Sequence, residues 1–353
     1  MKIIFLSGST PVDHSLNNSG EYNNLLLKAL SKAGFQVGSL ENASVFINLN
    51  HDKNSVRKAS RNSRVFKVLI RTEPISVFPA QYTMRVENQY DLVITTGRPK
   101  RRIGKFLDIH HPYRTLSNPN FPELEEINHH NQHIEKEEDV HSFSNWNRRP
   151  IYLSMIASNK VSTQKENYYD LRRKFASEAL DNGLEIYGTL WNASYTKRIR
   201  HRVGVGLHAL RYGTIPNLPS LYGGLHRSYA SRKGAPQDKQ IIVRSSKFSL
   251  VIENSNTYLS EKLFDAFVGG SIPIFFGPEL SKYGIKEDNL VIRHQGSLSK
   301  LRSHLENISE SEILVRLDSI KQFVESNYFL REWDAENIFS EASFAITELQ
   351  ERL

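Results

Sequence analysis

The sequence lacks cysteine altogether among its 353 residues. Disulfide bonds, thiolate zinc sites and cysteine nucleophiles are therefore excluded. It also lacks any run of 18 apolar residues, so no transmembrane helix is expected. The apolar run near the N-terminus, residues 3–6, is too short for the core of a signal peptide and predicts a first strand instead. These absences predict a cytoplasmic protein, either soluble or peripheral to the inner face of the membrane.

Acidic residues are fewer than basic ones: 38 Asp and Glu stand against 46 Lys and Arg, which gives a formal net charge of +8. A basic protein can bind nucleic acid, anionic lipid or phosphorylated small molecules. The sequence has no zinc-finger spacing, no RNP-like segment and no basic zipper. We therefore expect no nucleic-acid partner, and a nucleic-acid binder is kept only as a remote alternative.

Residues 247–278 carry the most informative pattern in the chain. An apolar run at 248–252 predicts a buried strand, and apolar positions at 263, 264, 267 and 268 predict one face of a helix. Gly269 and Gly270 end that helix, and a second strand follows at 271–276. The stretch is therefore predicted to form one β-α-β unit.

The polar residues of this unit fall where ligands bind in α/β sheets, at the end of a strand and the first turn of the next helix. A helix N-terminus suits a phosphate, and a lysine there adds a positive charge. Glutamate and lysine in a first helical turn can equally be ordinary surface residues. The candidate ligand-binding residues are Glu253, Asn254, Tyr258, Glu261 and Lys262.

The order of these residues resembles the C-terminal signature of the family 10 glycosyltransferases, the α-1,3/1,4-fucosyltransferases. The match covers about thirty residues, and Ser246 stands where that family commonly has tyrosine. It consists of Lys247-Phe248, Glu253-Asn254-Ser255, Tyr258-Leu259-Ser260-Glu261-Lys262 and Ile272-Pro273.

Residues 1–113 alternate strand and helix signals, which implies a parallel sheet covered by helices and one Rossmann-like domain. Strands are expected at 2–6, 35–37, 44–49, 65–70 and 91–95, and helices at 20–33 and 55–61. The strand at 65–70 runs into Thr72-Glu73-Pro74. By the resemblance, which places a general base in such a turn, Glu73 is the candidate catalytic base; a surface glutamate before a proline-fixed turn is the alternative.

Residues 114–148 are expected to be a linker or long loop. His129, His130 and His133 lie in it, but an irregular polar segment lacks the frame that orients metal ligands, so no metal site is predicted.

A second Rossmann-like domain is predicted at 149–330, with strands at 151–157 and 184–188 and a helix at 168–180. By the resemblance, Arg172 falls on the pyrophosphate-binding arginine, and its planar fork can hold two phosphate oxygens. Arg173 is the fallback if the register is off by one, and an exposed helix cation is the alternative for either. Ser158 and Asn159, at the end of the first strand, are weaker candidates.

Residues 192–234 are interpreted as an insertion near the cleft. The basic residues of 197–211 could contact a phosphorylated or lipid-linked acceptor and bring the protein to a membrane surface, or could form a solvated loop. A final strand is expected at 289–292, helices at 297–308 and 309–326, and a terminal helix at 332–353 that crosses back to the first domain.

Two Rossmann-like domains facing a cleft constitute the GT-B architecture. The resemblance implies an inverting transfer of fucose from GDP-fucose to a hydroxyl of an oligosaccharide, with Glu73 as base and fixed cations holding the leaving diphosphate. Since no Asp-x-Asp triplet is present, no metal or other cofactor is expected. The alternatives are a transferase for another nucleotide sugar and a sugar-nucleotide-binding protein without turnover.

Overall fold

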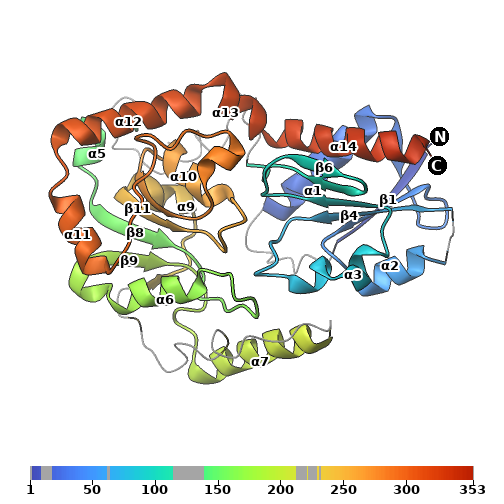
Figure 1. The fold of residues 1–353 in the computed structure, drawn as a ribbon, viewed down its shortest axis with the longest axis horizontal. Helices are drawn as coiled ribbons and strands as arrows, with labels where there is room; N and C mark the ends of the chain where they lie inside the picture. Colours follow the sequence, from blue (N-terminus) through green and yellow to red (C-terminus); the bar gives the residue numbers. More distant parts are fainter. Residues whose placement is uncertain are drawn as a thin grey trace.

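The computed structural model describes residues 2–8, 18–61, 64–113, 139–211, 221, 229 and 232–352. It contains two β-sheets, one in each half of the chain, and both halves alternate strands with helices (Figure 1). The predicted arrangement of two α/β halves is therefore confirmed.

The first sheet has seven strands in the order β2-β1-β3-β4-β5-β7-β6. All its pairings are parallel except the hairpin of β6 and β7. The central strands β3, β4 and β5 are buried almost throughout, in keeping with their mostly apolar sequences. The bounds are β1 (Lys2–Gly8), β2 (Phe35–Val37), β3 (Val45–Leu49), β4 (Phe66–Arg71), β5 (Leu92–Thr95), β6 (Arg101–Ile103) and β7 (Phe106–Asp108).

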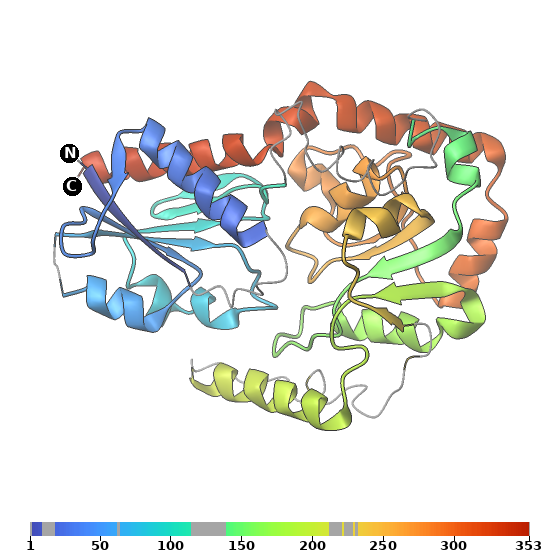
Figure 2. The ribbon, with the colours of Figure 1, turned by 180° about the vertical axis from the view of Figure 1, so that it is seen from behind.

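Helices cover both faces of this sheet. On one face α1 (Asn18–Lys32) packs beside the C-terminal helix α14 (Ala335–Glu351), and their apolar residues share one core with the strands (Figure 2). On the other face α2 (Lys53–Ala59) and α3 (Met84–Glu87) enclose a smaller core. The 3₁₀ helix η1 (Pro79–Tyr82) lies between β4 and α3 in the chain.

The second sheet has five parallel strands in the order β10-β9-β8-β11-β12. Helices α9 and α10 pack against β8, β11 and β12. The strands are β8 (Ile151–Ile156), β9 (Leu184–Tyr187), β10 (Arg232–Gly234), β11 (Ser246–Ile252) and β12 (Ile272–Phe276). The helices are α5 (Phe143–Asn147), α6 (Tyr169–Ser177), η2 (Leu180–Asn182), α7 (Tyr195–Arg211), α9 (Lys239–Arg244), α10 (Glu261–Val268), η3 (Leu280–Tyr283), α11 (Leu298–Glu306) and α12 (Glu310–Glu325).

The C-terminal segment returns to the first sheet through α13 (Asn327–Glu332) and α14. The expectation of one helix over 332–353 was wrong at its start, because α13 ends at Glu332 and Asp334 caps a new helix by accepting a hydrogen bond from Asn337 N. Trp333 lies in this break. It is fully buried, stacks on His110 at 4.3 Å and contacts Phe264 of α10 at the same separation. One indole thus packs against residues of both halves.

Two further expectations were wrong. Residues 289–292 form no strand, since only an isolated bridge joins Ile292 to Ile274. The segment 192–234 contains the 17-residue helix α7, which sequence analysis missed because two glycines interrupt an otherwise helical pattern. Part of this segment, and most of 114–148 with its three histidines, lie outside the described residues; α5 occupies the end of the latter segment.

Among the described residues, none of the helices has the length and apolar character needed to cross a bilayer.

Candidate active site

A cavity of about 330 Å³ opens at the carboxyl ends of the strands, where the two halves meet. The first half contributes Thr72 and Glu73, which follow β4, and His111, which follows β7. The second half contributes most of the remaining lining. Its polar side chains there are Ser154, Ser158, Lys160, Arg172, Thr189, Lys239, Ser249, Asn254, Tyr258, Ser260, Glu261, Lys262 and Asp265.

The start of α10 is fixed by a buried carboxylate. Glu253, fully buried at the end of β11, accepts hydrogen bonds from the backbone N and the hydroxyl of Ser260 at 2.9 and 2.8 Å. Ser260 is the N-cap of α10, and its hydroxyl also accepts a hydrogen bond of 2.7 Å from Lys262 Nζ. Glu253 does not line the cavity, so its part is to hold the helix start and the lysine in place.

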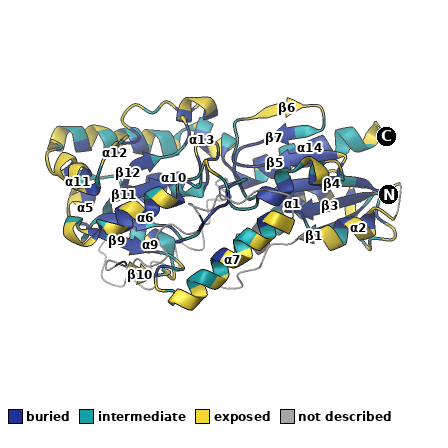
Figure 3. Ribbon diagram, turned by 60° about the horizontal axis from the view of Figure 1, so that its bottom comes forward, coloured by how far each residue is buried: buried dark blue, intermediate teal, exposed yellow. Residues whose placement is uncertain are grey.

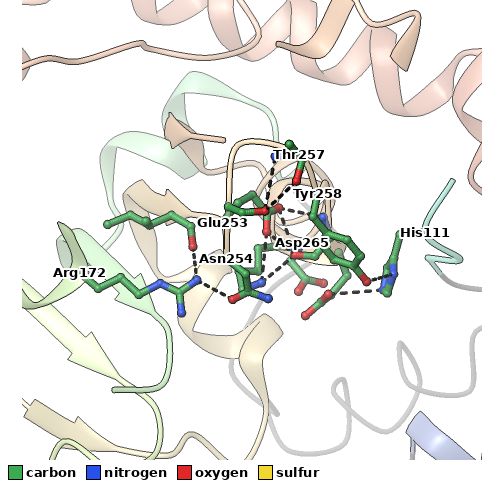
Figure 4. A network of polar contacts seen from close by, with 12 residues as sticks. His111, Arg172, Glu253, Asn254, Thr257, Tyr258 and Asp265 are labelled. Atoms are coloured by element: carbon green, nitrogen blue, oxygen red, sulfur yellow. Dashed lines mark hydrogen bonds and ion pairs between the residues drawn. The ribbon is translucent and has the colours of Figure 1, made fainter. Parts of the chain in front are cut away.

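Arg172 brings a guanidinium to the same place from α6. It is 2% exposed, and its Nη2 donates to the Ile252 carbonyl at 2.6 Å and to Asn254 Oδ1 at 3.0 Å. Figure 4 shows the side chain directed at Asn254. Nη2 is thus occupied by β11 and the following turn, and Nε is buried without a hydrogen-bond partner in the structure.

The three weaker candidates of the sequence analysis differ in whether they line the cavity. Ser158 lines the cavity, whereas Arg173 and Asn159 do not, although both are buried. Arg173 donates to the Lys160 carbonyl at 2.8 Å and pairs with Asp170 at 2.5 Å. Its bonds therefore hold the loop after β8, and the neighbouring Lys160 supplies the side chain that reaches the cavity.

Glu73 lies across the cavity from these cations, on the first half. Burial raises the pKa of its carboxyl, the nearby Glu261 raises it further, and Lys160 and Lys262 oppose the shift. Its backbone carbonyl accepts hydrogen bonds from Gln81 Nε2 and the Tyr82 hydroxyl at 3.0 and 2.9 Å, which fixes the turn. A buried carboxyl with a raised pKa, carried on a turn whose backbone is fixed, suits a general base.

Tyr258 joins the two halves at the edge of the cavity. Its hydroxyl donates to the Thr72 carbonyl at 2.7 Å and lies 3.0 Å from His111 Nδ1. Next to it, Leu259 N donates to the Gly97 carbonyl at 2.9 Å. The hydroxyl of Tyr258 is thus occupied by contacts across the junction, although Tyr258 was predicted to bind the sugar donor. A sugar donor in the cavity would meet the ring of Tyr258.

Gly97 is needed at this junction for two reasons. Its φ of +76° is left-handed, and an added Cβ would lie 2.4 Å from the Tyr258 ring. We expect Gly97→Ala to lower the free energy of unfolding by about 1–3 kcal/mol, measured by denaturant unfolding. Gly104→Ala is the matched control, because Gly104 has φ +56° and nothing within 4 Å of the added atom. Equal losses in the two variants would show that the Tyr258 contact does not matter.

Glu261 is held as an anion. Burial raises the pKa of its carboxyl, but Lys262, Lys239 and His111 together hold it well below its ordinary value. Its oxygens lie 3.6 Å from His111 Nε2 and 3.8 Å from Lys239 Nζ. An ionised carboxylate at the cavity wall can accept hydrogen bonds from the hydroxyls of a sugar.

Sequence reasoning missed four of the charged or titratable lining residues: His111, Lys160, Lys239 and Asp265. Lys160 directly follows Ser158 and Asn159, so continuing past the strand end would have found it. His111 follows β7, which was not predicted. Burial lowers the pKa of this histidine, and the charge of Glu261 opposes that shift. Lys239 Nζ donates to the buried Asp265 at 3.0 Å, a pairing between two helices that no local signal reveals.

Metal ligands are not grouped in the described part of the chain: no three His, Asp or Glu side chains there are placed to hold an ion.

No family model matches the sequence. Parts of the chain are similar to fucosyltransferases. A 59-residue segment is 41% identical to a fucosyltransferase-like protein of Arabidopsis thaliana, covering 16% of this chain and 11% of that protein. An 84-residue segment is 33% identical to chimpanzee 4-galactosyl-N-acetylglucosaminide 3-alpha-L-fucosyltransferase 9, covering 22% of this chain and 23% of that enzyme. The matched segments thus span less than a quarter of these relatives.

Solved structures match over nearly the whole chain. An α1,3-fucosyltransferase with GDP superposes with a TM-score of 0.54 at 13% identity, covering 98% of this chain and 90% of the other. Anabaena HepE in complex with UDP and glucose superposes with a TM-score of 0.52 at 11% identity, covering 99% and 100%. The predicted GT-B fold is confirmed by this likeness together with the two sheets, in which all strand pairings but one are parallel.

Proposed function

We propose that this protein is an inverting glycosyltransferase that moves L-fucose from GDP-fucose to a hydroxyl of an oligosaccharide acceptor. The observation that carries the proposal is the placement of Glu73 across one cavity from Lys160, Arg172 and Lys262. The GT-B fold and the partial identity to fucosyltransferases support the same class.

The donor would lie along the second half. Its diphosphate would meet the start of α10, the guanidinium of Arg172 and the ammonium groups of Lys160 and Lys262. A helix N-terminus and fixed cations favour an anion without any rearrangement. Asn254 and Glu261 would hold hydroxyls of the donor, and Glu253 would act only through Ser260 and Lys262.

The reaction would be a single displacement. The acceptor hydroxyl attacks the anomeric carbon, its proton passes to the Glu73 carboxylate, and the bond to the diphosphate oxygen breaks on the opposite side. The leaving nucleoside diphosphate takes up negative charge, which the three cations stabilise. The anomeric configuration inverts because attack and departure occur on opposite faces.

A second candidate is a transferase of the same fold that uses a UDP-sugar, favoured by the comparable superposition on HepE with UDP and glucose. Binding without turnover would require that Glu73 has no role in proton transfer.

A thermal-shift panel with GDP, UDP, CDP and ADP separates these candidates. A ligand that binds only the folded state at a hundredfold excess over Kd stabilises it by about 2.7 kcal/mol. We expect GDP alone to raise the Tm, equally with and without EDTA, and GDP-fucose to be turned over when an acceptor is added. A shift with UDP instead would contradict the fucose assignment, and no shift with any of the four would contradict the enzyme assignment.

A further inference from the structure

Helix α7 presents an apolar stripe to solvent. Val203, Leu207 and Leu210 are 47%, 62% and 61% exposed, and their spacing of four and three residues places them on one face. A different side of the helix holds the buried residues Arg202 and Ala209. The helix is therefore seated on the protein by one side, and Figure 3 shows the exposed residues along its other side.

The same helix is basic and contains no acidic residue. Arg200 and Arg211 are exposed and share the outer face with the apolar stripe, and the exposed Lys197 lies beside it. Apolar side chains flanked by cations, with no carboxylate among them, match the pattern of helices that lie in the interface of an anionic bilayer.

The position of α7 connects its outer face to the candidate active site. Figure 1 shows the helix running beneath both halves, on the side away from α12 and α14. It packs against η1, and His208 lies 5.3 Å from the ring of Phe78. Phe78 and η1 belong to the segment that leads on from Glu73, so α7 touches the loop that carries the candidate base.

We infer that the outer face of α7, made of Lys197, Arg200, Val203, Leu207, Leu210 and Arg211, docks the protein on an anionic lipid surface. The leucines enter the boundary between headgroups and acyl chains, and the three cations pair with lipid phosphates. The inference does not depend on the identity of the sugar donor.

Lipid fits this face better than nucleic acid does. A nucleic acid would use the cations for its phosphates and would stack bases on aromatic or guanidinium groups. It would leave Val203, Leu207 and Leu210 in water at the centre of the contact. A bilayer accommodates both kinds of side chain at once.

Vesicle co-sedimentation of the full chain tests the inference, with phosphatidylcholine vesicles that contain or lack phosphatidylglycerol. We expect binding only to the anionic vesicles, weakened by added salt. Lys197→Gln with Arg200→Gln and Arg211→Gln is expected to weaken it on the order of 100-fold, at about fivefold per charge. Leu207→Gln with Leu210→Gln, which keeps the helix propensity, is expected to weaken it by at least about tenfold.

Matched controls lie elsewhere on the surface. Leu314→Gln with Val315→Gln removes similarly exposed apolar residues from α12, and Lys53→Gln with Arg57→Gln and Lys58→Gln removes three exposed cations from α2. Both controls are expected to bind like the parent protein, and thermal unfolding checks that every variant is folded. Absence of binding to anionic vesicles, equal losses in the controls, or salt-sensitive binding of an oligonucleotide in place of vesicles would each overturn the inference.

Discussion

Glu73→Gln is expected to lower kcat by about 10²–10⁴-fold, because the amide cannot accept the acceptor proton and general bases typically contribute that much. The substitution preserves the shape of the side chain and removes a negative charge from a cavity proposed to hold a diphosphate. GDP should therefore bind as tightly as before or more tightly, which calorimetry measures directly.

The pH dependence of kcat/KM gives a second readout of the same group. The base works only when ionised, and burial raises the pKa of Glu73 above its ordinary value of 4.5. Activity should therefore fall as the pH falls through that raised pKa, and the acid limb should be absent from the residual activity of Glu73→Gln. Glu166→Gln, at an exposed position before α6, serves as the control. Unchanged turnover in Glu73→Gln would remove this residue from the base role.

The part of the site that the sequence predicted is the part encoded locally. The strand and the helix within residues 246–268 follow from one apolar run and one helical stripe, so the positions of Asn254, Glu261 and Lys262 could be placed in advance. Glu73 could be placed for the same reason, since β4 is a mostly apolar strand that ends two residues before it.

The missed part depends on contacts between distant segments. His111 reaches the cavity because a short hairpin strand, β7, pairs with β5 in the first sheet, and three residues leave little periodicity to detect. The ion pair of Lys239 with Asp265 depends on how α9 packs on α10. Glu253 was predicted among the residues that bind the sugar donor. In the structure its carboxylate points into the protein, where it accepts hydrogen bonds from the backbone N and the hydroxyl of Ser260. Nothing in the local sequence distinguishes a carboxylate facing a ligand from one that caps the next helix.

Arg172→Lys is expected to weaken GDP binding on the order of 10- to 100-fold, because each hydrogen bond to a charged group contributes about 1.5–3 kcal/mol. Lysine keeps the charge but replaces a planar fork by a single ammonium. That ammonium must serve the Ile252 carbonyl and Asn254 Oδ1, which the guanidinium now holds, before it can reach a phosphate. Calorimetry with GDP, together with kcat at saturating donor, measures the loss.

Arg173→Lys is the matched control on the adjacent residue. Arg173 is as buried as Arg172, but it bonds to the Lys160 carbonyl and to Asp170 and does not line the cavity. Both variants should lose stability, since each leaves acceptors less well paired, whereas only Arg172→Lys should lose GDP affinity. A loss of affinity confined to Arg173→Lys would move the diphosphate to the neighbouring register. Equal losses in both would mean that the guanidinium of Arg172 acts through the fold of α6 rather than on the donor.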